Sequence, residues 1–143
     1  MSMDEMITKL RHVGYIVKDM DKSVNLFKKL FDVKDEDIRE LTADDTGGAG
    51  AFSFISVGGT ELELIQPISD YFKEMTGDPP EGINHIAFQV KDVEKAVKTM
   101  EEKGIHLGYI TKDGIFDTGG TKLAYLDPRD TDGILIELVE AKS

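Results

Sequence analysis

The chain of 143 residues contains one short segment twice, and this repeat limits the fold more than any other feature. The copies are Arg-His-Val-Gly-Tyr-Ile-Val-Lys-Asp at residues 11–19 and Asn-His-Ile-Ala-Phe-Gln-Val-Lys-Asp at residues 84–92. Superposing His12 on His85 aligns the alternating apolar residues, which indicates a half-buried strand in each copy. Each histidine falls on the less apolar face of its strand. An amphipathic segment with helical spacing follows each copy.

The repeat extends to the end of each half. Leu-Glu-Leu-Ile at residues 62–65 corresponds to Ile-Glu-Leu-Val at residues 136–139, so Glu63 falls on Glu137. A duplication with a period near 73 residues predicts two βαβββ halves. We expect one domain over residues 1–143, with a first half at about 10–67 and a second half at about 83–140. The Pro-rich stretch at residues 78–82 marks the boundary.

Each predicted half has a strand, a helix and three more strands. The predicted strands are residues 11–18, 38–42, 51–57 and 60–67 in the first half, and 84–90, 106–111, 121–126 and 133–140 in the second. The first helix follows a cap at Asp19 or Asp21 and ends near Leu30. The second helix covers about residues 93–103, between a cap at Asp92 and a stop at Gly104.

Composition excludes several classes of function. The formal net charge of −11 opposes unspecific binding to nucleic acid or to an anionic membrane. No apolar run approaches 18 residues, so we expect no membrane span. The chain has no cysteine, which excludes disulfides, thiolate metal sites and cysteine nucleophiles. With no secretory signal at the N-terminus, we expect a cytoplasmic protein.

Two imidazoles and two carboxylates at equivalent repeat positions suggest one metal site built by His12, Glu63, His85 and Glu137. A single histidine or glutamate on a strand is more often structural. However, a glutamate among the apolar residues around Glu137 is costly to bury unless it is paired, bound to metal or in a wet cavity. Four such ligands would leave two positions for water or substrate on a divalent Co, Ni, Mn, Zn or Fe ion. His106 has no repeat mate, so we interpret it as an ordinary strand or surface residue.

These stretches resemble the vicinal oxygen chelate, or glyoxalase, superfamily over about residues 10–140. The resemblance rests on the paired His-strand-helix units, Gly-Ile-Asn-His-Ile-Ala-Phe at residues 82–88, the Gly119-Gly120 loop, the Pro128 turn and Gly-Ile-Leu-Ile-Glu-Leu at residues 133–138. It implies an α+β fold in which two βαβββ repeats form a curled mixed-sheet cup, with helices outside. The family's metal ligands map onto His12, Glu63, His85 and Glu137.

Within the superfamily, the likeness is greatest to the methylmalonyl-CoA epimerases. It implies an isomerase that binds one divalent metal ion, takes an acyl-CoA or other thioester substrate and forms a homodimer. Epimerisation would remove the α-proton through a metal-stabilised enolate, with Glu137 as one acid/base and Glu63, or a water near Ser53, as the second. Some bacterial epimerases have a catalytic glutamate where Ser53 aligns. We therefore expect Ser53 to face the cup and contact substrate.

Three alternatives remain open from the sequence. Glyoxalase I (lactoylglutathione lyase) uses the same ligand set to isomerise a glutathione hemithioacetal. An extradiol-type iron dioxygenase would use the triad His12, His85 and Glu137, and the additional Glu63 argues against it. Some superfamily members are metal-free proteins that bind or sequester small molecules, and these have no need of a symmetric ligand set.

Overall fold

The computed structural model describes residues 2–76 and 82–141, which form two compact units. Unit 2 covers His12–Asn84. Unit 1 combines the N-terminal residues up to Arg11 with the chain from His85 onward. The expected boundary at residues 78–82 lies outside the described residues, apart from Gly82.

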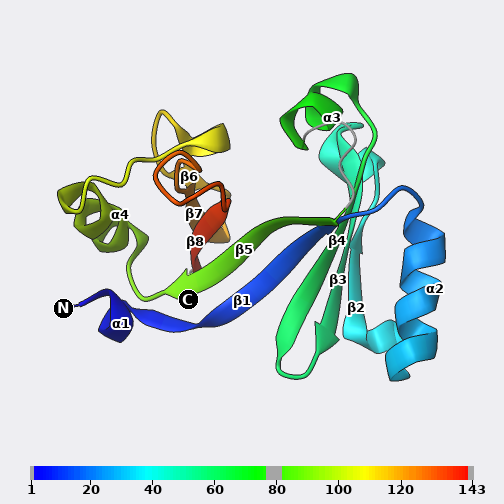
Figure 1. Cartoon of the computed structure of the whole chain (residues 1–143). Coiled ribbons are helices and arrows are strands. Elements are labelled where there is room, and N and C mark those ends of the chain that lie inside the picture. The colour runs from blue at the N-terminus through cyan, green and yellow to red at the C-terminus, as the bar shows by residue number, and fades with distance from the viewer. Residues whose placement is uncertain (1, 77–81, 142–143) are drawn as a thin grey trace. The chain divides into compact units, whose positions relative to one another are not determined.

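Unit 2 contains one complete βαβββ repeat (Figure 1). Its elements are β1 (Ile7–Ile16, from His12 onward), α2 (Met20–Phe31), β2 (Ile38–Leu41), β3 (Gly50–Val57), β4 (Thr60–Pro67) and α3 (Asp70–Thr76), with 3-10 turns η1 (Asp35–Asp37) and η2 (Asp44–Thr46). The strand order is β2-β3-β4-β1, with β1 parallel to β4 and the other pairs antiparallel. Gly58 and Gly59 both have positive φ, as the tight β3–β4 hairpin requires.

The helix α2 covers one face of these strands. Asp19 caps it by accepting a hydrogen bond from the backbone N–H of Lys22. Its buried residue Val24 packs in one cluster with Ile55 of β3 and Leu64 of β4, both of which are fully buried. The face of β3 and β4 on which α2 packs is therefore the core face. The opposite face carries Glu63.

Unit 1 contains the second repeat. Its elements are α1 (Met3–Met6), β5 (Gly82–Val90, from His85 onward), α4 (Val93–Glu102), η3 (Tyr109–Thr111), β6 (Phe116–Asp117), β7 (Thr121–Tyr125) and β8 (Ile136–Ala141). The strand order is β1-β5-β8-β7-β6, with β5 parallel to β8. Asp92 caps α4 as expected. Val93, Ala96 and Val97 of α4 pack on Ala124 and Leu138.

Strand β1 contributes to both units. Its residues from His12 onward pair with β4 in unit 2. Its earlier residues belong to unit 1, where Thr8 Oγ1 donates a hydrogen bond to the carbonyl of Gln89 in β5. Met6, directly before the strand, is 2% exposed and lies in the core of unit 1. The strand starts four residues before the expected 11–18 because residues 7–10 are extended beside β5 although they are exposed.

One predicted strand is wrong. Residues 106–111 form a single bridge at Leu107, followed by the 3-10 turn η3, and the corresponding strand β6 begins later, at Phe116. Tyr109 has a φ of 55°, which breaks an extended conformation. Thr111 secures the turn, because its hydroxyl donates to the carbonyls of Gly108 and Tyr125. The last strand also starts later than expected, at Ile136.

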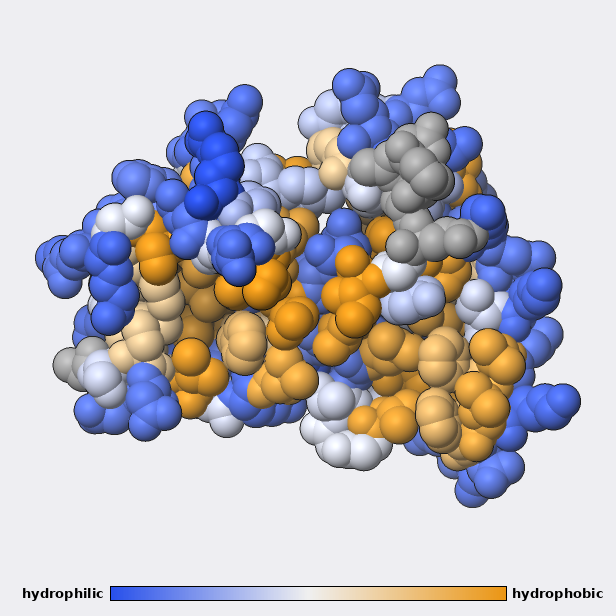
Figure 2. Space-filling view, in the orientation of Figure 1, coloured by the Kyte–Doolittle hydropathy of each residue, from blue (hydrophilic) through white to orange (hydrophobic). Residues whose placement is uncertain are grey.

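The α+β class with two βαβββ repeats and mixed strand pairing is confirmed. No helix among residues 2–76 and 82–141 is long and apolar enough to cross a membrane. Hydrophobic side chains still reach the surface beside charged ones, as Figure 2 shows. On α2 these include Leu26, Leu30 and Phe31.

Replacing the buried core leucine of unit 2 tests this packing. We expect Leu64→Ala to lower the free energy of unfolding by about 2–5 kcal/mol, because it leaves a cavity beside Ile55 and Val24. Leu30→Ala, at a side chain 55% exposed, makes the same chemical change outside the core and should cost about 0.5 kcal/mol or less. Urea unfolding followed by circular dichroism measures both. Equal losses would contradict the assignment of Leu64 to the core.

Candidate metal centre

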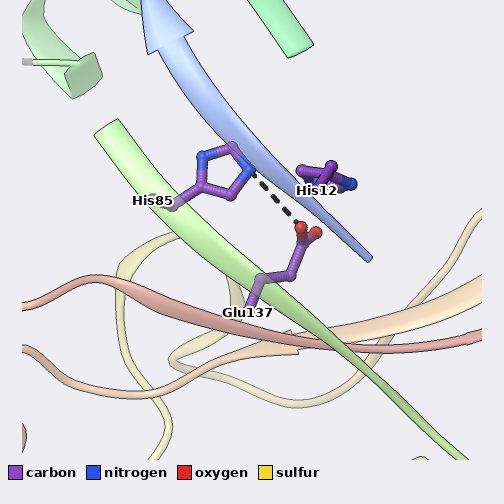
Figure 3. Close-up of side chains that lie close together, drawn as sticks. All are labelled: His12, His85 and Glu137. Atoms are coloured by element: carbon purple, nitrogen blue, oxygen red, sulfur yellow. Dashed lines mark ion pairs between the residues drawn. The ribbon is translucent and has the colours of Figure 1, made fainter. Parts of the chain in front are cut away.

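Unit 1 places His85 beside Glu137. Their strands β5 and β8 run parallel, and Glu137 pairs with Ala87, two residues beyond His85. The Nε2 atom of His85 lies 3.5 Å from Oε1 of Glu137, as the dashed line in Figure 3 marks. Each of the two residues is only 4% exposed. The second repeat therefore brings together the histidine and glutamate that the sequence singled out.

Unit 2 repeats this arrangement with His12 and Glu63. Strands β1 and β4 are parallel, and Glu63 pairs with Gly14, again two residues beyond the histidine. The Nε2 atom of His12 lies 3.7 Å from Oε1 of Glu63, and both residues are 8% exposed. Each repeat thus builds the same buried His–Glu pair from the same pair of parallel strands.

An aromatic ring supports the histidine in each repeat. Phe54 of β3 pairs directly with Glu63 and meets the ring of His12 edge-on, with ring centroids 6.4 Å apart. In the other repeat, Tyr125 of β7 pairs with Glu137 and meets His85 edge-on at 5.6 Å. Sequence reasoning missed these rings because the loops before the two glutamates differ in length. Counting back along each antiparallel hairpin would have found both.

Each His–Glu pair has the atoms and the spacing of ligands to a divalent metal ion. A nitrogen and an oxygen that each lie about 2.1 Å from one ion are separated by about 3.0–3.4 Å, depending on the coordination angle. The observed separations of 3.5 and 3.7 Å are close to this range and longer than an ordinary N–H···O hydrogen bond. A buried carboxylate needs a compensating cation or hydrogen bonds. Imidazole nitrogen and carboxylate oxygen together suit a first-row divalent ion.

The expected position of Ser53 is wrong. Ser53 pairs directly with Leu64, and residues opposite each other in a ladder share a face. That face is the one covered by α2, where Ser53 is 1% exposed and its next neighbour on the face is the core residue Ile55. The residue of β3 on the face of Glu63 is Phe54. A sequence alignment through the preceding glycine fixes position along the strand, whereas the ladder register fixes the face.

His106 lies outside the two pairs, as expected for a histidine without a repeat mate. Its Nδ1 atom is 2.9 Å from the carboxylate of Asp130, and its side chain is 70% exposed. The backbone N–H of His106 also donates to Asp130, and these two hydrogen bonds lower the pKa of that carboxyl group. This contact ties residue 106 to the loop before β8.

A family comparison identifies the superfamily to which the chain belongs. Residues 11–125 match the family described as the Glyoxalase/Bleomycin resistance protein/Dioxygenase superfamily. The chain belongs to this superfamily, which confirms the resemblance drawn from the repeated His-strand-helix units.

Curated relatives include methylmalonyl-CoA epimerases. The mitochondrial methylmalonyl-CoA epimerase of Dictyostelium discoideum is 28% identical over 140 residues, covering 94% of this chain and 79% of that protein. The ethylmalonyl-CoA/methylmalonyl-CoA epimerase of Cereibacter sphaeroides is 27% identical over 139 residues, covering 93% of this chain and 98% of that protein. The relatives therefore support an epimerase-like enzyme.

A solved structure shares the fold. A variant of Streptomyces coelicolor methylmalonyl-CoA epimerase, in complex with 2-nitronate-propionyl-CoA, superposes with a TM-score of 0.75. It is 20% identical and the match covers 96% of this chain and 99% of that chain. This structural neighbour binds a CoA thioester.

Metal removal and return test the two His–Glu pairs. Adding Co²⁺, Ni²⁺, Mn²⁺ or Zn²⁺ to chelator-treated protein should raise Tm by about 5–10 °C for the best-fitting ion at 100 times its Kd, because the ion binds the folded state alone. His85→Ala should abolish most of this rise, whereas His106→Ala should retain it. Differential scanning calorimetry measures the shift. An equal rise in all three proteins would contradict metal binding at His85.

Proposed function

We propose that this chain is a divalent-metal-dependent epimerase of methylmalonyl-CoA or a similar 2-substituted malonyl thioester. The observation that carries the proposal is the duplicated, buried His–Glu pair in a chain related to methylmalonyl-CoA epimerases. The proposed ligands are His12, Glu63, His85 and Glu137, with the choice among Co, Ni, Mn, Zn and Fe left to measurement. A bound ion would supply a Lewis acid that polarises the thioester carbonyl and makes the α-proton more acidic.

The carboxylates carry the proton chemistry in this proposal. Epimerisation needs one group to take the α-proton on one side of the carbon and another to return a proton on the opposite side. Glu137 and Glu63 occupy equivalent places in the two repeats, so we assign the two acid/base roles to them. The alternative second group, a water near Ser53, is dropped because Ser53 lies on the face covered by α2.

Burial supports these roles for the glutamates. Excluding water strengthens the electrostatic interactions within a site and limits side reactions of a reactive intermediate. Glu63 and Glu137 are 8% and 4% exposed. The rings of Phe54 and Tyr125 cover their imidazole partners on one side and restrict the approach of water.

Exchange of the α-proton tests the assignment of Glu137. We expect the wild-type protein to exchange the α-proton of methylmalonyl-CoA with heavy water, followed by NMR, and Glu137→Gln to slow exchange at least about 100-fold. Glu102→Gln, at an exposed residue ending α4, is the matched control and should leave exchange unchanged. Metal content is measured on each variant. Exchange retained by Glu137→Gln with metal bound would contradict the role of Glu137.

The glyoxalase I alternative predicts a different substrate. The same preparation is given methylglyoxal and glutathione, and formation of the lactoyl thioester is followed by absorbance. We expect no turnover above the Glu137→Gln background. Turnover of the hemithioacetal without α-proton exchange of methylmalonyl-CoA would replace the epimerase proposal with a lyase. The homodimer implied by the family stays a prediction, and light scattering measures it.

A further inference from the structure

One basic side chain lies on the same face of unit 2 as His12 and Glu63. Arg39 of β2 pairs directly with Phe54 of β3, and Phe54 pairs directly with Glu63 of β4. These three residues form one row across neighbouring strands, and directly paired residues share a face. With strands about 4.8 Å apart, the backbone of Arg39 is roughly 10 Å from that of Glu63. Arg39 is the one basic residue in the fully described strands β2, β3 and β4.

The guanidinium of Arg39 contacts the aromatic ring that supports His12. Its Cζ atom lies 4.2 Å from the centroid of the Phe54 ring, which is a cation–π contact. The same ring meets His12 edge-on. Stacking on a ring fixes the plane of a guanidinium and leaves its edge N–H groups directed away from the ring. Arg39, Phe54 and His12 are therefore in successive contact on this face.

Arg39 retains donors for a further partner. It forms an ion pair with Glu61, but the separation of 3.8 Å is longer than a hydrogen bond. Its side chain is 61% exposed, whereas that of Glu61 is 24% exposed. An exposed ion pair of this kind contributes little to stability. An arginine carries five N–H donors, so it can contact Glu61 and a second carboxylate together.

The two repeats differ at this point and agree elsewhere. Both present a buried glutamate, a histidine and an edge-on ring. In the second repeat the ring of Tyr125 is contacted by Tyr109 at 5.0 Å, whereas in the first the ring of Phe54 is contacted by Arg39. One repeat thus adds a phenol and the other a cation. The two repeats are therefore alike in their His–Glu pairs and differ in the charge beside the supporting ring.

We propose that Arg39, stacked on Phe54, binds the free carboxylate of the substrate's 2-substituted malonyl group and so selects thioesters that carry an acid at the reacting end. This inference rests on the proposed function and adds a specificity residue to it. A carboxylate matches the planar fork of a guanidinium. In such a substrate the carboxylate is bonded to the α-carbon, whereas the CoA phosphates are separated from it by the pantetheine arm. A cation in the row of Glu63 therefore fits the acid better than the phosphates.

The test compares two ligands that differ only in the carboxylate. Malonyl-CoA and acetyl-CoA are titrated into the metal-loaded 143-residue chain by calorimetry. We expect Arg39→Gln to raise the Kd of malonyl-CoA about 10- to 100-fold and to leave that of acetyl-CoA unchanged. Arg39→Lys keeps the charge without the fork, so its effect should be intermediate. Lys22→Gln, which removes one charge from an exposed position of α2, should change neither ligand.

The other outcomes distinguish a failure of the inference about Arg39 from a failure of the proposed function. If Arg39→Gln weakens both ligands equally, Arg39 contacts the CoA portion and the carboxylate assignment is wrong. If it weakens neither, while wild-type protein binds malonyl-CoA, the inference fails and the proposed function stands. If wild-type protein binds neither ligand, the proposed function fails and the inference with it. An unchanged Tm of Arg39→Gln shows that the fold is intact.

Discussion

The cost of burying two carboxylates governs the organisation of this protein. A charged carboxylate removed from water requires a cation or several hydrogen bonds close by. Glu63 and Glu137 are both buried, and each has the Nε2 atom of a histidine within 4 Å. The parallel pairing of the first and last strands of each repeat supplies that histidine in both units. A divalent ion bound as proposed would add further compensation, so the fold and the proposed chemistry would share one electrostatic requirement.

Much of this arrangement could be predicted from sequence because side chains alternate along a strand. Alternation places His12 and Glu63 opposite the apolar residues of their own strands, and the repeat assigns the same faces to His85 and Glu137. Local signals also sufficed for the helix cap at Asp92 and for the turn at Gly58 and Gly59. They limited the first cap to Asp19 or Asp21, of which the structure has Asp19. These features depend on neighbours in sequence, or on a pattern that occurs twice.

Features that depend on register between strands have no signal within one strand. The face of Ser53 follows from its pairing with Leu64, which counting across the Gly58-Gly59 hairpin would have given. The contact of Arg39 with Phe54 follows from the pairing of β2 with β3, and the longer loop between those strands leaves their register open in the sequence. The turn at Tyr109 was missed for another reason, since its left-handed backbone is secured by Thr111 through bonds to Gly108 and Tyr125. The repeated order of elements predicts a strand at residues 106–111 and carries no signal for this turn.

The division of β1 between the units affects which fragments of this protein can fold by themselves. Met6 and the first residues of β1 supply core and strand pairing to the C-terminal half of the sequence. A fragment containing the second repeat alone would expose the edge of β5 and lack Met6. The two copies are therefore similar in sequence but unequal as folding units: the later copy is completed by residues made first. During synthesis, Met6 and the first residues of β1 are made before the second repeat. Unit 1 can therefore fold only after that repeat has been made.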